Sequence, residues 1–412
     1  MGDAAILQGE IRALRTILGD DIEIDVAEQT PTVARRLYPS IRFHAGLHVQ
    51  HAHWPRWRSH GGVASIRKRR TKLAVWLLTR APWLARAIMT AEQRQHLRRM
   101  AAADVVVATG GTYFVEHYDF TAKAHEVLVA QALGKPTFLF TQSMGPFTRP
   151  KSQEKMRRIV AGITGVFLRD ERSRGHLTAI GADAGKLSVH ADLAFALATP
   201  ERARPAGTSA AASPSASSNP PRARVAISVR SWSHFKKGSG GDAGDRYRRA
   251  VADCARTLAR GGTEVTFLST CQGVPEYWTD DSRYASALVA DLLPNEPNVR
   301  VDTRFRTPEQ LAEELRTYDV AIATRMHFAI LALCVATPVV AIAYEFKSRE
   351  LLRAMGREAW AFDIEDVTGE GLVKATHEAL AGGDALRSEI TQQVQAYRDD
   401  AIGPARRIAA AL

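Results

Sequence analysis

Hydrophobic residues in this chain form short uninterrupted runs that alternate with longer segments of helical periodicity. The clearest example is DVAIATRMHFAILALCVATPVVAIAYEFK, residues 319–347. It predicts a buried strand at 320–323, a helix at about 328–335 and a second strand that Pro338 opens and Tyr344 ends. A strand, a helix and a strand in this order form the parallel crossover unit of α/β proteins.

The same alternation recurs on both sides of one polar, low-complexity segment. Ahead of it, strands are predicted in DVVVATGGTYF, TFLFTQ, GVFLRD and LSVH, and behind it in VAISVR and EVTFLST. The segment between them has almost no apolar bulk, so it cannot contribute to a core. We therefore predict an α/β chain with one domain at residues 1–200, a disordered Ala/Ser/Pro linker at 201–223 and a second domain at 224–412.

The chain opens almost directly on an amphipathic helix, MGDAAILQGEIRALRTIL, with Asp3 as its expected N-cap. Doubly wound domains usually begin with a strand before such a helix. Here the next apolar segment, residues 22–26, is the first strand candidate. We expect either a domain that lacks its first strand or a true start that lies upstream.

Residues 67–88, RKRRTKLAVWLLTRAPWLARAI, place four basic residues before an apolar face that carries Trp76 and Trp83. Arg80 and Pro82 interrupt this segment, so it cannot span a membrane. One interpretation, which we favour, is a helix pair that covers the core and has a solvated basic edge. The other is a segment that lies on an anionic membrane surface.

Composition narrows the class of protein. Of 412 residues, 45% are hydrophobic and 24% charged, as in soluble globular proteins, and the formal charge of +11 favours anionic partners. The basic residues are spread along the chain and form no recognisable nucleic-acid module, so we expect no nucleic-acid partner. Three widely spaced cysteines argue against a disulfide framework and indicate a reducing, cytoplasmic location. The histidine-rich residues 39–60 lack matching carboxylates and thiolates, so we expect no metal site there.

Candidate functional residues follow the predicted strands, because ligands of parallel α/β sheets bind outside the carboxyl ends of the strands. Arg325 and His327 lie where strand 320–323 gives way to a helix, and Arg230 closes VAISVR. A helix N-terminus favours an anion. A fixed cation beside an imidazole suits an anionic substrate that also needs a proton moved. The alternative is a surface ion pair and a structural histidine.

Several segments, in this order and spacing, resemble the polysaccharide pyruvyl transferase family, and within it the colanic-acid type. They are GDAAIL, GGTYFVEHYDF, FTQSMGPF, RDERSRGHL, the DLAF step at 192–195, ISVR and TRMHFAILA…PVVAIAYEFK. The resemblance extends from Gly2 to the helix after Lys347. It implies two Rossmann-like domains facing across a cleft, similar to the GT-B glycosyltransferases, with the acceptor side in the first domain and the donor side in the second.

The resemblance also implies the reaction. The family transfers pyruvate from phosphoenolpyruvate onto two hydroxyls of a sugar as a cyclic ketal, and the acceptor here would be an exopolysaccharide or its lipid-linked precursor. The family's donor-binding and proton-transfer residues correspond to Arg325, His327 and Arg230. Phosphoenolpyruvate carries a carboxylate and a phosphate, so it needs at least two cations, and His327 is the expected proton donor. Lys347 either adds charge or is an exposed lysine after a strand. No cofactor or metal is required.

On the acceptor side, the Gly110–Gly111 turn and the loop that begins at Ser143 are expected to shape the wall of the site. The candidates for a general base are Glu116, Asp119 and Asp192. For each of these carboxylates, a structural cap or a hydrogen bond to an acceptor hydroxyl is the stronger interpretation.

Two other functions stay open. A glycosyltransferase would use the same fold with a nucleotide sugar, and Glu345 would then be the carboxylate that binds the ribose. A non-catalytic member would lie on a membrane through the basic, tryptophan-bearing segment. Peripheral contact with the inner membrane face is a candidate in either case, and the sequence specifies neither the oligomeric state nor the acceptor sugar.

Overall fold

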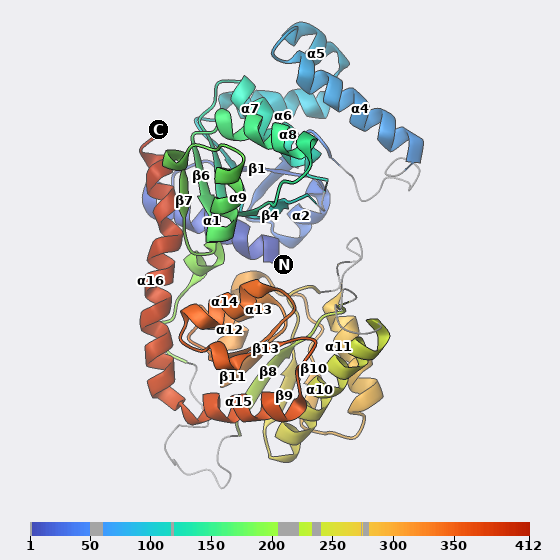
Figure 1. Cartoon of the computed structure of the whole chain (residues 1–412), viewed down its shortest axis with the longest axis vertical. Coiled ribbons are helices and arrows are strands. Elements are labelled where there is room, and N and C mark those ends of the chain that lie inside the picture. The colour runs from blue at the N-terminus through green and yellow to red at the C-terminus, as the bar shows by residue number, and fades with distance from the viewer. Residues whose placement is uncertain are drawn as a thin grey trace. The chain divides into compact units, whose positions relative to one another are not determined.

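The structure is a computed structural model that describes residues 2–49, 61–116, 119–204, 222–232, 240–272, 274 and 280–412. Most of the predicted linker, residues 205–221, lies outside the described residues. The chain divides into two compact units (Figure 1). The C-terminal unit comprises Met1–Gln8 and Ala194–Asp399, and the N-terminal unit comprises Gly9–Leu193 and Asp400–Leu412. The first residues of the chain thus belong to the C-terminal unit, and the last residues belong to the N-terminal unit. The predicted domains at 1–200 and 224–412 are contiguous and do not include this exchange.

The C-terminal unit is built on one parallel sheet. Its strands are β8 (Arg224–Ser228), β9 (Glu264–Phe267), β10 (Val299–Val301), β11 (Val320–Ala323), β12 (Val339–Ala343) and β13 (Ala361–Asp363). The strands lie in the order β10-β9-β8-β11-β12-β13. Counted along the unit this is 3-2-1-4-5-6, the order of the Rossmann fold. The central strands β8, β11 and β12 are apolar runs that are almost entirely buried, as expected where helices cover both faces.

The helices of this unit are α10 (Gly240–Arg260), α11 (Asp281–Leu292), α12 (Pro308–Arg316), α13 (Met326–Leu333), α14 (Phe346–Ala354), α15 (Gly369–Ala381) and most of α16 (Gly383–Ala409). The strand predicted at 320–323 is confirmed as β11. Helix α13 begins at Met326, two residues before its predicted start, because Arg325 is the N-cap. His327 therefore lies in the first helical turn.

The N-terminal unit holds a second parallel sheet. Its strands are β3 (Val106–Ala108), β4 (Gly111–Phe114), β5 (Thr137–Met144), β6 (Gly165–Leu168) and β7 (Leu187–Val189), in the order β3-β5-β6-β7 with β4 also paired to β5. Strands β1 (Asp25–Glu28) and β2 (Arg42–Ala45) form a separate parallel pair. The histidine-rich region thus contains a strand, and the residues after Gly110 form a strand of their own.

The helices of the N-terminal unit are most of α1 (Gly2–Leu18), α2 (Pro31–Leu37), α4 (Gly61–Leu77), α5 (Pro82–Ile88), α6 (Ala91–Ala102), α7 (Thr121–Ala132), α8 (Pro150–Ala161) and α9 (Glu171–Ala179). The predicted first helix is confirmed, but it begins at Gly2, so Asp3 lies in its first turn and is not the N-cap. The helix pair predicted at 67–88 is confirmed as α4 and α5. Among the described residues, no helix combines the length and hydrophobicity needed to cross a membrane.

Candidate active-site residues at the sheet edges

The first group of candidate residues lies where the strand order of the C-terminal sheet reverses. Strands β8 and β11 are neighbours there, and ligands of doubly wound sheets bind at this switch point. The Thr324 N–H donates to the Ser228 carbonyl at 3.2 Å. The Tyr247 hydroxyl lies 2.9 Å from the Thr324 hydroxyl and accepts a hydrogen bond from the Arg230 N–H at 3.3 Å. The loops that carry Arg230 and Arg325 are therefore fastened to each other.

Arg230 is held by aromatic rings. Its guanidinium carbon lies 4.2 Å from the ring centre of Tyr344 and 4.8 Å from that of Trp232. Burial raises the pKa of the Tyr344 phenol, and the nearby charge of Arg230 opposes that rise. Among the ion pairs of the described residues, none includes Arg230. Cation–π contact orients a guanidinium without neutralising it, so Arg230 keeps its charge for an anionic ligand.

Arg325 is a fixed cation, as predicted, but it forms a buried ion pair and not the surface ion pair of the alternative interpretation. Its Nε and Nη2 donate to the two carboxylate oxygens of Asp281 at 2.7 and 2.8 Å. Both side chains are largely buried, with 16% and 3% exposed. Burial acts to lower the pKa of Arg325, but the hydrogen bonds to Asp281 and nearby charges raise it overall. Arg325 is thus a fixed arginine whose charge is already balanced by a partner that the sequence pattern did not reveal.

His327 packs against the start of the chain. A methyl group added at Gly2 would come within 2.6 Å of His327 Nδ1, so the ring lies directly against the glycine backbone. Gly2 is the first residue of α1, and His327 is in the first turn of α13. The positive ends of two helices therefore meet at this imidazole, and each favours an anion nearby.

Lys347 and Glu345 follow β12, the strand next to β11. Lys347 is half-buried in the first turn of α14, and its ammonium lies 6.0 Å from the Phe346 ring centre. Glu345 is the exposed N-cap residue of α14 and makes no side-chain cap hydrogen bond. Both side chains are thus at the same sheet edge as Arg230.

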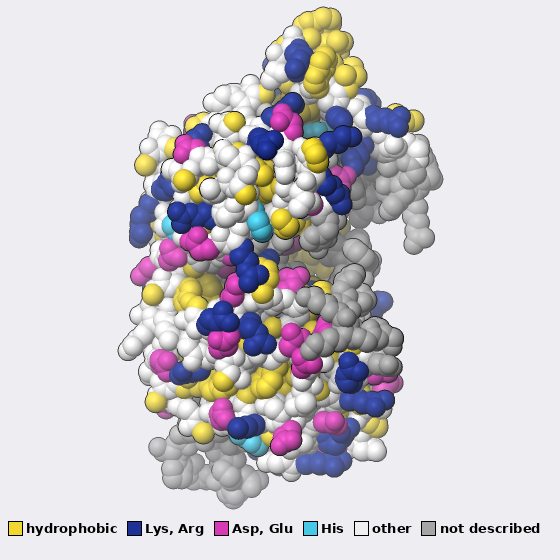
Figure 2. Space-filling view, in the orientation of Figure 1, with side chains coloured by type: hydrophobic (Ala, Val, Ile, Leu, Met, Phe, Trp, Pro, Cys, Tyr) yellow, Lys and Arg dark blue, Asp and Glu magenta, His cyan; other side chains and the backbone are white. Residues whose placement is uncertain are grey.

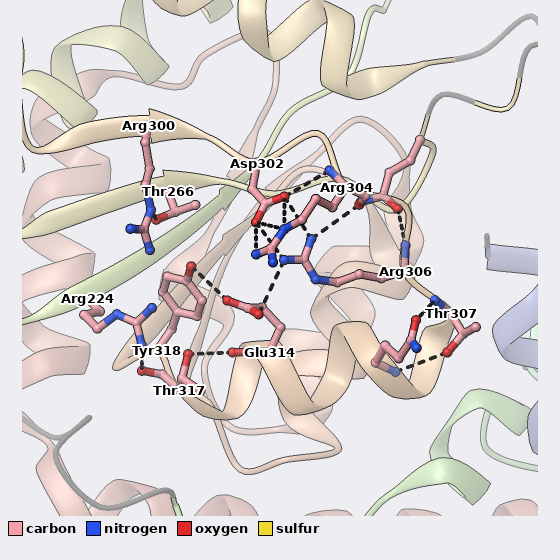
Figure 3. A network of polar contacts seen from close by, with 12 residues as sticks. Arg224, Thr266, Arg300, Asp302, Arg304, Arg306, Thr307, Glu314, Thr317 and Tyr318 are labelled. Carbon is pink, nitrogen blue, oxygen red and sulfur yellow. Dashed lines mark hydrogen bonds and ion pairs between the residues drawn. The ribbon is translucent and has the colours of Figure 1, made fainter.

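A network of polar contacts supports this edge from β10 (Figure 3). Asp302 accepts hydrogen bonds from Arg304 and Arg306, the shortest at 2.6 and 2.7 Å, and these arginines hold the pKa of its carboxyl well below the usual range. The Arg306 N–H donates to Gln272 Oε1 at 2.7 Å. Next to Gln272, the Cys271 carbonyl accepts from the Asp281 N–H at 2.8 Å. The network thus connects to the carboxylate that holds Arg325.

The second group of candidate residues is centred on Arg169, just after β6 in the N-terminal unit. Its three nitrogen atoms donate to Asp192 Oδ2 at 2.6 Å, Thr112 Oγ1 at 2.6 Å and Ser143 Oγ at 2.8 Å. The Arg169 and Asp192 side chains are buried, with 7% and 8% exposed. Sequence reasoning selected Ser143 and Asp192 but missed Arg169, although it lies in the quoted segment RDERSRGHL. Because Asp192 is committed to Arg169, it serves as a structural partner.

The other acceptor-side candidates have local structural roles. Gly111 has a φ of +144°, and a methyl group there would meet the Tyr113 ring at 2.6 Å, so only glycine fits after the buried Gly110. Glu116 accepts hydrogen bonds from the Thr148 hydroxyl at 2.6 Å and from the Arg149 N–H. The bond from Thr148 is the main reason that the pKa of Glu116 falls to about 2.

Asp119 lies at the start of α7. It pairs with Lys68 and accepts from the Thr121 N–H at 3.1 Å. The hydrogen bond from Lys68 is the main reason that its pKa lies well below the usual range. Asp119, like Glu116, is therefore kept ionised by local hydrogen bonds and is a weak base.

Glu10 is a titratable residue that the sequence analysis passed over. It lies four positions after Ile6, on the buried side of α1, and only 6% of it is exposed. Burial raises the pKa of this carboxyl to about 7, against a smaller opposing effect of Thr109. A glutamate on an otherwise apolar helix face is the signal that could have identified it.

Histidines from the region first considered for metal binding form hydrogen-bonded chains. His44 Nε2 lies 3.0 Å from His96 Nδ1, and His96 Nε2 lies 2.7 Å from Glu126 Oε2. His48 Nε2 lies 2.9 Å from His125 Nδ1. In the parts of the chain that the structure describes, no group of three or more metal-ligating side chains is arranged to hold an ion. His51 and His53 lie outside the described residues.

Comparison with known sequences gives a family match. Residues 1–345 match the family described as "Polysaccharide pyruvyl transferase". The amylovoran biosynthesis protein AmsJ of Erwinia amylovora is 24% identical over 404 residues, which cover 96% of this chain and 93% of AmsJ.

Comparison with solved structures gives the fold. The S. aureus MnaA–UDP co-structure has a TM-score of 0.57 at 10% identity and covers 99% of this chain and 92% of its own. The UDP-GlcNAc 2-epimerase from Neisseria meningitidis bound to UDP-GlcNAc has a TM-score of 0.54 at 11% identity, covering 98% and 95%. A glycosyltransferase from Rickettsia africae ESF-5 has a TM-score of 0.51 at 13% identity, covering 96% and 89%. These likenesses confirm the predicted α/β fold of GT-B type with two Rossmann-like domains.

Proposed function

Because the chain belongs to the polysaccharide pyruvyl transferase family, we propose that it transfers the pyruvyl group of phosphoenolpyruvate onto two hydroxyls of one sugar. The product is a cyclic ketal on an exopolysaccharide or on its lipid-linked precursor. The similarity to AmsJ, an amylovoran biosynthesis protein, supports an exopolysaccharide as the acceptor class.

One observation carries the proposal. Arg230 is charged and oriented by Tyr344 and Trp232, and it lies at the switch point of the sheet where two helix N-termini meet at His327. Phosphoenolpyruvate carries a carboxylate and a phosphate, and both are recognised by a guanidinium fork and by helix N-termini. Arg230 binds one anionic group and Lys347 assists. Arg325, fixed by Asp281, offers its remaining nitrogen, Nη1, as a positioned hydrogen-bond donor.

The proposed reaction needs a proton donor, and we assign this role to His327. His327 protonates the methylene carbon C3 of phosphoenolpyruvate, which generates an oxocarbenium-like centre at C2. The first sugar hydroxyl adds to C2, the bond from C2 to the phosphate oxygen breaks, and the second hydroxyl closes the ring. The two hydroxyl protons end on the new methyl group, through reprotonation of His327, and on the released phosphate. A separate general base is not required. The Arg169 network keeps Ser143 and Thr112 in fixed positions for the acceptor.

Phosphate release from phosphoenolpyruvate tests the proposal, measured with galactosyl, glucosyl and mannosyl acceptors for the wild type and His327→Gln. We expect release that depends on an acceptor and falls by about 10²- to 10⁴-fold in the variant, the usual contribution of a general acid. His377→Gln, an exposed histidine on α15, is the matched control and should retain wild-type activity. Release that is unchanged in His327→Gln would remove this residue from the chemistry.

The same assay tests the role of Arg230. We expect Arg230→Gln to raise KM for phosphoenolpyruvate by about ten- to a hundredfold, because a hydrogen bond to a charged group contributes about 1.5–3 kcal/mol. Arg249→Gln, at an exposed position of α10, is the control. An unchanged KM in Arg230→Gln would place the donor elsewhere.

A nucleotide-sugar transferase is the second candidate, because two proteins of similar fold are seen with UDP or UDP-GlcNAc. Glu345, exposed after β12, would then bind the ribose. Calorimetric titration with UDP-GlcNAc and with phosphoenolpyruvate separates the two. Binding of only the nucleotide sugar, weakened in Glu345→Gln, would favour this second function. Binding of neither ligand, with no phosphate release, would favour a non-catalytic member.

A further inference from the structure

Helices α4 and α5 form a helical hairpin whose two sides differ. On the inner side, Thr71, Ala74 and Leu77 are buried. Ala74 and Met89 join a core cluster with side chains of α6 and α7, which are Leu97, Met100, Val129 and Ala130. The hairpin is thus packed onto the N-terminal unit through one face.

The outer side of the hairpin is apolar. The described residues include eight large hydrophobic side chains that are exposed, and five of these lie on α4 and α5: Ile66 at 67%, Leu73 at 50%, Trp76 at 53%, Trp83 at 73% and Leu84 at 36%. Figure 2 shows hydrophobic side chains gathered at the top of the view, where Figure 1 draws α5, with Lys and Arg side chains nearby. Leaving two tryptophans this exposed is unfavourable in water, and such a patch marks an interaction surface.

The charge of the hairpin indicates that its partner is anionic. Residues 61–88 contain seven Arg and Lys residues and no Asp or Glu, and no acidic residue occurs anywhere between Glu28 and Glu92. The Arg80 guanidinium carbon lies 4.5 Å from the ring centre of Trp76, so one cation lies on the apolar patch itself.

Basic side chains of neighbouring elements add to this field. Lys155 donates to the Thr121 hydroxyl at 2.9 Å, and Lys68 pairs with Asp119, two positions earlier, so both lysines lie at the start of α7. The acidic groups near them on this side include Asp119, which pairs with Lys68, and Glu126 of α7, which bonds to His96. The surface is therefore both apolar and positive.

An anionic lipid bilayer matches both properties. Tryptophans locate at the boundary between headgroups and acyl chains, and arginines reach the phosphates from the same helix. A second copy of this chain would bring one positive surface against another. We propose that the outer face of α4–α5 docks on an anionic membrane surface, with Trp76 and Trp83 entering the interface and Arg69, Arg70 and Arg80 contacting headgroups. This inference does not depend on the proposed reaction.

Vesicle co-sedimentation tests the proposal with the full chain. We expect binding to vesicles of phosphatidylglycerol and phosphatidylcholine, little binding to pure phosphatidylcholine, and weaker binding at high salt. The doubly substituted variants Trp76→Ser/Trp83→Ser and Arg69→Glu/Arg70→Glu should each bind at least tenfold more weakly. Their thermal midpoints should match the wild type, because the side chains point outward.

Matched controls use exposed residues away from the hairpin. Leu412→Ser removes an apolar side chain that is 60% exposed, and Arg249→Glu/Lys374→Glu makes the same change in charge on the C-terminal unit. Both should bind as the wild type does. Equal binding of all variants would overturn the proposal, as would a dimer that the tryptophan substitutions dissociate in the absence of vesicle binding. Phosphate release with a water-soluble acceptor should be the same in the hairpin variants, which separates this test from that of the proposed function.

Discussion

At the scale of residues, the proposed donor site depends on contacts between residues that are far apart in sequence. His327 lies against Gly2, and Arg325 is held by Asp281. A glycine at the first of these contacts has a steric reason, since any side chain would occupy the space of the imidazole. The segment GDAAIL therefore contacts the proposed proton donor through its backbone.

We expect Gly2→Ala to reduce phosphate release at least tenfold. The added methyl group would lie 2.6 Å from His327 Nδ1. The ring would therefore have to leave the position from which we propose that it protonates the donor. Gly175→Ala is the control, because it makes the same change within a helix where nothing lies within 4 Å. Wild-type rates in Gly2→Ala, measured at saturating phosphoenolpyruvate, would show that the ring can shift without loss.

The candidate residues of the proposed donor site could be selected from sequence, but their structural partners could not. Arg230, Arg325 and His327 stand out because each follows an apolar run at a predicted strand end. No local pattern joins Arg325 to Asp281, or joins Arg169 to Thr112, because such pairs form only when distant strands are aligned in one sheet. The pairing of Arg325 with a buried carboxylate was therefore not predicted.

At the scale of elements, the support of the site depends on the segment between β10 and α12. Asp302 and Arg306 form a buried ion pair, with 15% and 7% of their side chains exposed. Arg306 also donates its backbone N–H to Gln272, in the loop that follows β9. A buried pair of this kind stabilises the structure only as long as both partners are present.

We expect Arg306→Ala to lower the free energy of unfolding by about 1–3 kcal/mol, because it removes a buried side chain that donates hydrogen bonds to both Asp302 and Glu314. Urea denaturation at pH 7 measures the loss. Arg304→Ala removes an arginine from the same carboxylate, but its side chain is 73% exposed, so the loss should be much smaller. Equal losses in the two variants would mean that burial does not decide the strength of these contacts.

Elements with a clear apolar pattern were predicted well, and elements without one were not. Strand β11 and helix α1 follow directly from local sequence. Strands β2 and β4 have four residues each. Histidines surround β2 and glycines precede β4, and both patterns are typical of loops. These strands exist because β1 and β5 are available to pair with them, which is information carried by the tertiary structure.

At the scale of the whole molecule, a buried carboxyl group and two buried imidazoles make stability depend on pH. Burial raises the pKa of Glu10 from 4.5 to about 7, so its contribution is lost as the pH rises through that range. Burial lowers the pKa of His44 and His125 from 6.5 to about 4, so their contribution is lost as the pH falls. These opposite slopes partly cancel in the wild type between about pH 4.5 and 6.5.

We expect Glu10→Gln to remove the loss of stability that accompanies the ionisation of Glu10 as the pH rises. The variant should gain up to about 3 kcal/mol of stability relative to the wild type between pH 4.5 and pH 7.5, since one unit of pKa corresponds to about 1.4 kcal/mol. Urea denaturation at intervals across this range measures the difference. Glu309→Gln, an exposed glutamate in the first turn of α12, should give a nearly constant difference. A flat difference for Glu10→Gln would show that this carboxylate is ionised in the folded protein.

The crossing of both chain ends between the two units has a consequence for proteolysis. A cut within residues 205–221 leaves one piece that contains residues 1–204 and another that contains residues 222–412, and each piece carries residues of both units. The first piece keeps Gly2, which packs on His327 of the second, and the second keeps Asp400, which accepts a hydrogen bond from the backbone N–H of Ala191 at 2.7 Å. Neither piece therefore contains a whole unit. The nicked protein should remain one folded, active particle, and the two separately produced halves should complement each other when they are refolded together.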